Sequence, residues 1–328
     1  MKRILAAVLT LSLAPLSHAS LIPFQSFIGS YGVSTDGFGS LTNNGTITAN
    51  VPVGATVTAA YLYSAYYGGS LTPNVSLNGS SANFTSNTLN PGNGLGAARA
   101  DVTSLVASVV NGGGGGTYAF NVSEINGGNI DGEGLVVVYS LNGLPTSTIA
   151  ILDGFSASTG DSTAVNFSQA LDPTSIGFHA DLMLGDSFSC CGQASTIKVN
   201  GTQITSNAGN NDDSKDPSLG NGNLITVGGW NDPYSILNPS YDNDHERYSL
   251  IPEILAGDTS IHINTLNPSG DDNIFLAVLN VSGEAAINAP PPNTSPVPEP
   301  GTILQLGTGL LSLGAFQARK LYSKLKRA

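Results

Sequence analysis

Between residues 20 and 288, short apolar runs alternate with clusters of turn residues. Seven runs are rich in β-branched and aromatic residues and have the length of strands. The segments between them, such as NNGT, NGGGGG and NGGNIDGEG, supply Gly and Asn, which tolerate a positive φ. Because one segment alone has a helical period, we predict antiparallel pairing in an all-β sandwich or jelly roll. The predicted strands span residues 56–67, 116–122, 134–141, 147–152, 195–199, 259–265 and 273–283.

The pattern within these runs predicts how each strand is covered. VVVY and IAIL are apolar at every position, which is typical of central strands that are buried on both faces. TSIHINT alternates instead, so Ile261 and Ile263 should face the core, and His262 should face solvent. The one helical segment is DVTSLVASVV, residues 101–110, for which Asp101 is the expected N-cap.

Four tyrosines stand in the run at residues 56–67. Tyr61 and Tyr63 share one face by the period of two, whereas Tyr66 falls on the opposite face. Two interpretations remain open at this stage. The rings can pack in the core or across strands, as aromatic side chains commonly do, or Tyr61 and Tyr67 can form a platform on which a sugar stacks.

Composition favours a packed body with an acidic surface. The 328-residue chain has 40% hydrophobic and 10% charged residues, with 40 Gly and 18 Pro, unlike a disordered chain. Between the two ends, four basic residues stand against 22 acidic ones, so residues 20–295 carry a formal charge of −18. Such a body should repel nucleic acid, which is bound through clusters of Lys and Arg. The length allows one or two sandwich units, with a seam expected in the Gly/Asn-rich stretch 206–223.

The two ends of the chain have the composition of targeting segments. Residues 1–19 have a basic start, an apolar run and small residues before position 20, which is the layout of a secretory signal peptide. After the body at 20–288, the Pro-rich linker 289–300 is followed by 18 residues without formal charge, 301–318, and a basic tail, 319–328. That segment is close to the length of a membrane-spanning helix, with the tail on the cytoplasmic side.

The far end resembles the PEP-CTERM sorting signal of Gram-negative bacteria. The motif Val297-Pro298-Glu299-Pro300, the uncharged segment and the basic residues that begin with Arg319 and Lys320 follow one another in the order of that family. The basic residues are diluted by Leu321, Tyr322, Ser323 and Leu325, where many relatives have a compact Arg run. A plain membrane anchor would have the same topology before processing.

This resemblance implies a partner and a destination. In the family, a membrane enzyme of the exosortase type recognises the motif and removes the tail. The protein would then be anchored in the inner membrane only transiently before it reaches the cell surface or the extracellular matrix, often beside exopolysaccharide. The body, through most of residues 45–283, also resembles β-rich surface domains that accompany such tails, although no catalytic residues are carried over with this likeness.

Two local motifs suggest further chemistry. Asp242, Asp244 and Glu246 alternate along DNDHE, and their oxygens could converge on Ca²⁺, although the spacing is not that of an EF-hand; solvated acidic turns are the alternative. Cys190 and Cys191 are adjacent and are the two cysteines of the chain. In an oxidising compartment they would form a vicinal disulfide that locks a turn, or link two chains.

The functional expectation is a secreted, non-enzymatic surface or matrix protein with a structural or adhesive role near exopolysaccharide. The chain lacks the motifs G-x-S-x-G, H-E-x-x-H, G-x-G-x-x-G and the P-loop. A carbohydrate-binding module is the first alternative. A polysaccharide-acting hydrolase is the second, because Glu133, Asp153 or Asp186 could supply the two carboxylates that such an enzyme needs.

Mass spectrometry of the mature protein from its host tests whether the signal peptide and the C-terminal sorting tail are removed. We expect a first residue at Ser20 and a chain that ends near Pro300 without residues 301–328, because the leader and the sorting tail are both removed. A mature protein that still begins at Met1 and carries the tail would contradict both interpretations.

Overall fold

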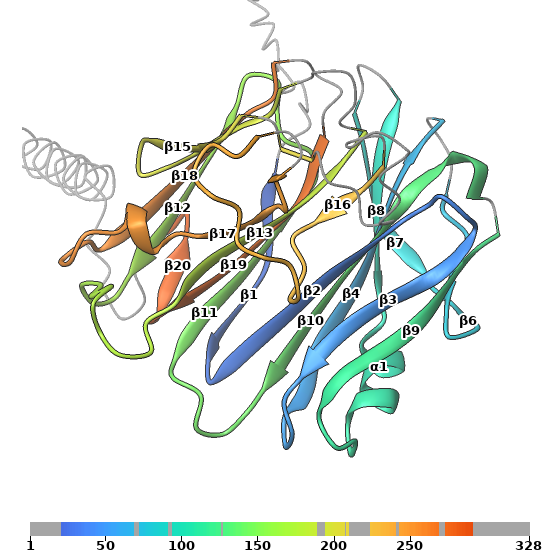
Figure 1. The fold of residues 1–328 in the computed structure, drawn as a ribbon, viewed down its shortest axis with the longest axis horizontal. Coiled ribbons are helices and arrows are strands. Elements are labelled where there is room, and N and C mark those ends of the chain that lie inside the picture. The colour runs from blue at the N-terminus through green and yellow to red at the C-terminus, as the bar shows by residue number, and fades with distance from the viewer. Residues whose placement is uncertain are drawn as a thin grey trace, which may run out of the picture. The chain divides into compact units, whose positions relative to one another are not determined.

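Four antiparallel sheets, here called A to D, make up the body. The computed structural model describes residues 21–68, 72–90, 94–125, 127–188, 194–206, 208–209, 224–240, 243–268 and 273–290. The expectation of an all-β, antiparallel sandwich-type body is confirmed. Within the body the sheets are layered in the order D, A, B, C, which Figure 1 shows from left to right.

Sheets A and B are the two inner layers. Sheet A has the order β1 (Ile22–Gly29), β11 (Ser147–Asp153), β19 (Asn273–Ser282), β13 (Ala180–Ser187) and β16 (Thr226–Val227), and β17 (Arg247–Ser249) also pairs with β13. Sheet B has the order β2 (Tyr31–Gly39), β10 (Ile130–Ser140), β4 (Thr56–Tyr67), β8 (Leu95–Asp101) and β7 (Phe84–Leu89).

Sheets C and D are the outer layers. Sheet C has the order β3 (Asn44–Val51), β9 (Gly116–Glu124), β5 (Val75–Leu77) and β6 (Ser80–Ser81). Sheet D has the order β15 (Thr202–Thr205), β14 (Thr196–Val199), β18 (Ser260–Leu266), β12 (Asp161–Phe167) and β20 (Ala285–Ile287). The short helices are α1 (Thr103–Val110), η1 (Gly127–Asn129) and η4 (Ile251–Glu253).

Three hydrophobic cores fill the spaces between the layers. One core joins sheets A and D, one joins B and C together with α1, and the third joins A and B. Strand β4 serves two of them, because Tyr61 and Tyr63 lie in the A/B core, whereas Leu62 and Tyr66 lie in the B/C core. The predicted separation of Tyr61 and Tyr63 from Tyr66 is therefore confirmed.

The chain builds the layers in two stretches. Residues 31–140 form sheets B and C, and β1 together with residues 147–287 forms sheets A and D. The chain thus crosses between the two pairs of sheets at Ser30, between β1 and β2, and again through residues 141–146. Most of the stretch at 206–223, where the sequence placed a seam, lies outside the described residues.

Two predictions about individual strands and one about the helix can be compared with the structure. VVVY and IAIL lie in β10 and β11, which are buried and have neighbours on both sides, and Ile261 and Ile263 are buried while His262 is exposed, as expected. The N-cap prediction was wrong: helix α1 has Val102 at that position, without a side-chain cap. Asp101 Oδ1 instead accepts a hydrogen bond of 2.9 Å from the amide of Thr103, because the aspartate still belongs to β8.

Arg99 connects the two inner sheets. From β8 of sheet B its guanidinium group forms an ion pair with Asp153 on β11 of sheet A. The guanidinium carbon also lies 3.3 Å from the centre of the Phe24 ring on β1. Tyr63 donates a hydrogen bond of 3.3 Å to the same carboxylate oxygen of Asp153. The ion-paired side chains are 17% and 15% exposed, so water screens this contact only weakly.

Replacing Arg99 by Met should therefore lower the free energy of unfolding. We expect a loss of about 3 kcal/mol, because the carboxylate of Asp153 would remain largely buried with one neutral donor. Urea unfolding followed by circular dichroism measures the change. The control Lys198→Met removes a basic residue that is exposed on β14 and should change stability by less than about 0.5 kcal/mol. An equal effect of both replacements would contradict the role of Arg99.

Candidate functional site

A cleft opens where the ends of sheets A and B meet. Its volume is about 790 Å³, which is within the range of pockets that bind small molecules. Segments of both sheets contribute to it, since Tyr67 ends β4, Asp131 lies near the start of β10 and Phe188 directly follows β13. The lining residues are Ser40, Asn43, Tyr67, Gly68, Leu95, Gly128, Ile130, Asp131, Phe188 and Leu224.

An aromatic pair forms one side of this cleft. The rings of Tyr67 and Phe188 meet edge to face, with 6.1 Å between their centres and 86° between their planes. Tyr67 is 46% exposed, and its hydroxyl group donates a hydrogen bond of 2.8 Å to the carbonyl oxygen of Gly128, which fixes the ring. An exposed ring held in this way offers a flat apolar surface to a ligand.

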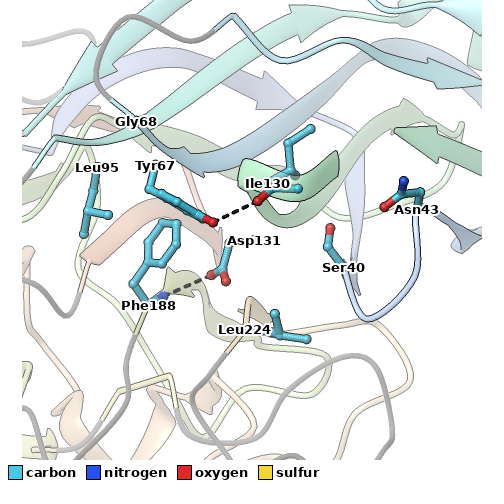
Figure 2. A pocket seen from close by; sticks show the side chains of 10 residues that line it. Ser40, Asn43, Tyr67, Gly68, Leu95, Ile130, Asp131, Phe188 and Leu224 are labelled. Carbon is cyan, nitrogen blue, oxygen red and sulfur yellow. Dashed lines mark hydrogen bonds between the residues drawn. The ribbon is translucent and has the colours of Figure 1, made fainter. Parts of the chain in front are cut away.

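Polar groups stand across from the rings. Figure 2 shows Tyr67 and Phe188 on one side, Ser40 and Asn43 on the other, and the carboxylate of Asp131 between them. Asp131 is the one lining residue that carries a formal charge among those described. The cleft thus combines aromatic surface with hydroxyl, amide and carboxylate groups, which is the kind of lining that suits a polyhydroxylated ligand.

Phe188 is held in an unusual backbone conformation. Its φ is +60°, in the left-handed region that side chains other than those of Gly, Asn and Asp seldom adopt. Its amide donates a hydrogen bond of 3.0 Å to Oδ2 of Asp131. Because strained residues of this kind cluster at ligand sites, the conformation is a second reason to place a site here.

The two tyrosines that the sequence proposed for sugar stacking have different environments. Tyr67 lines the cleft and is exposed. Tyr61 is 9% exposed in the A/B core, where the edge of its ring meets Phe24 at 5.0 Å between centres. The prediction that Tyr61 and Tyr67 form one platform therefore needs correction, because β4 carries Tyr61 into a core and its last residue, Tyr67, out of it.

The acidic loop forms a buried cluster. Asp244 and Glu246 are both 0% exposed, and the one hydroxyl hydrogen of Tyr248 is shared between their carboxylates. Thr205 and Ser235 also donate to Asp244, at 2.6 and 3.2 Å. Burial raises the pKa of Asp244 and that of Tyr248. The alternative of fully solvated acidic turns is wrong for Asp244 and Glu246, because both side chains are buried directly before strand β17.

Several predicted sites lie outside the described residues. These are the calcium ligand Asp242, the cysteines Cys190 and Cys191, the motif Val297, Pro298, Glu299 and Pro300, and the basic residues Arg319 and Lys320. Among the described helices, none has the length and apolar character to cross a membrane. In the same part of the chain, no three His, Cys, Asp or Glu residues are grouped so that they could hold a metal ion. The calcium site and the sorting signal thus stay predictions.

The carboxylates proposed for hydrolysis are not gathered at the cleft. Asp153 is engaged with Arg99 between the inner sheets, and Glu133 and Asp186 are both 0% exposed. Sequence reasoning missed the residues that line the cleft with Tyr67. Asp131 lies in NGGNIDGEG, a segment whose Gly and Asn residues predict a turn. Phe188 lies just before the cysteine pair, and an aromatic residue beside a loop was the one sequence feature that could have indicated it.

Comparisons with known proteins leave the family open. No protein-family model matches the chain, and no curated protein matches it. Among solved structures, the chain is similar to one described as BpGH86A, a beta-porphyranase of glycoside hydrolase family 86 from the human gut bacterium Bacteroides plebeius. The identity is 10%, the TM-score is 0.21, and the match covers 78% of this chain but 37% of that chain. A likeness of this size supports no conclusion about activity.

Chelation tests the calcium prediction. If Asp242, Asp244 and Glu246 hold Ca²⁺, adding EGTA should lower the thermal midpoint of the full chain, because a ligand that binds only the folded state stabilises it. Differential scanning calorimetry measures the midpoint, and Asp244→Asn should abolish the response to EGTA. An unchanged midpoint in the native chain would reject the calcium site.

Proposed function

We propose that this chain is a secreted surface protein that binds carbohydrate through the cleft and thereby acts as an adhesive component beside exopolysaccharide. The observation that carries the proposal is the exposed Tyr67 ring, fixed against Phe188 and facing Ser40, Asn43 and Asp131 across a cleft of about 790 Å³. Secretion and sorting by an exosortase-type enzyme belong to the same proposal and rest on residues 1–19 and 297–328.

Charge narrows the class of glycan. No Lys or Arg is among the described residues that line the cleft, and residues 20–295 carry a formal charge of −18. Two of the four basic residues are already engaged, since Arg99 pairs with Asp153 and Arg247 donates hydrogen bonds to the carbonyl oxygens of Trp230 and Asp232. A neutral or amino-bearing polysaccharide would therefore be favoured over an anionic one.

The number of carboxylate side chains that line the cleft favours a binding function over a hydrolytic one. Glycosidases of the common type place two carboxyl groups on either side of the bond that breaks. Asp131 is the one carboxylate among the described lining residues. A binding module needs no such pair, because stacking and hydrogen bonds are sufficient to hold a sugar.

A glycan array followed by calorimetric titration tests the proposal. We expect binding to at least one neutral or amino-bearing glycan, and at least about tenfold weaker binding by Tyr67→Ala, since the loss of a stacking ring costs more than about 1.4 kcal/mol. Tyr67→Phe keeps the ring and should retain most of the affinity.

The matched control is Tyr234→Ala. Tyr234 is also 46% exposed but does not line the cleft, so its replacement should leave the affinity unchanged. Circular dichroism confirms that each variant is folded. A blank array, or equal affinities of the Tyr67→Ala variant and the native chain, would overturn the proposal.

A further inference from the structure

Two buried glutamates lie next to the cleft. Glu124 ends β9 in sheet C and is 3% exposed, and Glu133 on β10 in sheet B is 0% exposed. Val122 and Leu135, each two residues away on the same strands, belong to the B/C core. Because strands alternate their faces, both glutamates point into that layer. The two carboxyl groups are close enough that the negative charge of Glu124 raises the pKa of Glu133.

Each carboxyl group has one oxygen with a hydroxyl donor and one without. Ser64 donates to Oε1 of Glu133 at 3.0 Å, and Ser40 donates to Oε1 of Glu124. The Oε2 atoms of both glutamates are buried and accept no hydrogen bond from a described donor. A single proton between the two glutamates would give these oxygens a hydrogen bond, since a protonated carboxyl group donates and an ionised one accepts.

The surroundings favour this protonated form. Burial raises the pKa of Glu133 well above its ordinary value, and the negative charges of Glu124 and Asp131 raise it further. Burial likewise raises the pKa of Glu124. The positions paired with the glutamates on neighbouring strands cannot titrate: Phe38 of β2 and Ser64 of β4 pair with Glu133, and Val75 of β5 pairs with Glu124. Two adjacent carboxylates in such a site resist simultaneous ionisation.

Glu124 is bonded to the wall of the cleft. Its carboxylate accepts the hydroxyl hydrogen bond from Ser40, and its amide donates a hydrogen bond of 2.8 Å to the carbonyl oxygen of Asn43. The amide of Ser40 in turn donates at 3.0 Å to the carbonyl oxygen of Asp131. All three of these partners line the cleft. A movement of the Glu124 side chain is therefore transmitted to the face that stands across from Tyr67.

We propose that Glu124 and Glu133 share one proton, and that loss of this proton loosens the wall of Ser40 and Asn43, so that the cleft binds its ligand more weakly as pH rises. The last part rests on the proposed carbohydrate-binding function. When both groups are ionised, their repulsion is relieved if the Glu124 side chain moves away from Glu133. The hydrogen bond from Ser40 to the Glu124 carboxylate then breaks, and the segment that carries Ser40 and Asn43 keeps only its backbone hydrogen bonds to Glu124 and Asp131.

The direction of the pH effect follows from the pKa of Glu133. Its value in the folded state lies above the unfolded value of about 4.3, so the folded protein holds more protons between the two values. The stabilisation is complete below about pH 4.3 and is lost as pH rises through the folded-state value. The closed wall is thus the acidic form.

Two measurements on the full chain test the proposal without a ligand. The chain has six glutamates, so ¹³C-labelled glutamate gives few carboxyl signals, and we expect one of them to titrate well above the ordinary range. Amide hydrogen exchange of Ser40 and Glu124, corrected for the intrinsic dependence on pH, should accelerate above that step by up to about tenfold per pH unit.

Glu133→Gln mimics the protonated form and should remove both the high titration step and the pH dependence of exchange. If the first variant fails to fold, Glu124→Gln removes the second carboxylate and should abolish the pH dependence of exchange. Glu133 should then still titrate above the ordinary range, because it remains buried. The control Glu253→Gln, in η4, should leave both observations unchanged.

The outcomes separate this inference from the proposed function. If all glutamates titrate in the ordinary range, or if the amides of Ser40 and Glu124 do not respond to the titration, the inference is overturned even where a glycan binds. If the titration and the exchange behave as expected but every glycan array is blank, the proton-controlled wall stands and the carbohydrate ligand is rejected.

Discussion

The contact between sheets A and B is the constraint on which the rest of the body depends. Each of these sheets is covered on both faces, so strands such as β10 and β11 must be apolar at nearly every position. A sheet with both faces covered has no face that can be polar and exposed to water, whereas each sheet of an ordinary two-layer sandwich has one. Polar side chains of the inner sheets therefore lie near the strand ends or are paired, as Arg99 and Asp153 are.

The position of the cleft follows from this arrangement. Tyr67 ends β4, Asp131 lies near the start of β10 and Phe188 follows β13, so the cleft lies at the ends of strands of the two inner sheets. At such ends the backbone leaves the ladder, and residues such as Phe188, with φ of +60°, can take up conformations that a strand forbids. A rigid layered body thus carries its polar and aromatic groups on connecting segments, as binding sites on β-sandwiches commonly do.

Not all of the acidic groups of the chain lie at its surface. Part of the negative charge is buried in pairs: Glu124 with Glu133 at the end of the B/C core, and Asp244 with Glu246 around Tyr248. These groups are held by hydroxyl donors from Ser and Tyr rather than by basic side chains, of which residues 20–295 have four. The total charge of the sequence therefore overstates the charge at the surface wherever a carboxyl group is protonated in the folded state.

The sequence by itself determined the all-β class, most central strands and their faces, because apolar runs such as VVVY and alternating runs such as TSIHINT reflect local burial directly. It did not reveal polar strands such as β2, YGVSTDGFG, whose Gly and Ser resemble a loop until β10 pairs with them. Only the tertiary structure decided that four sheets stack in one order, that Tyr61 is buried while Tyr67 is exposed, and that Glu124 meets Glu133. Those contacts join strands far apart along the chain, and a pattern of neighbouring residues carries no information about which distant strand will cover it.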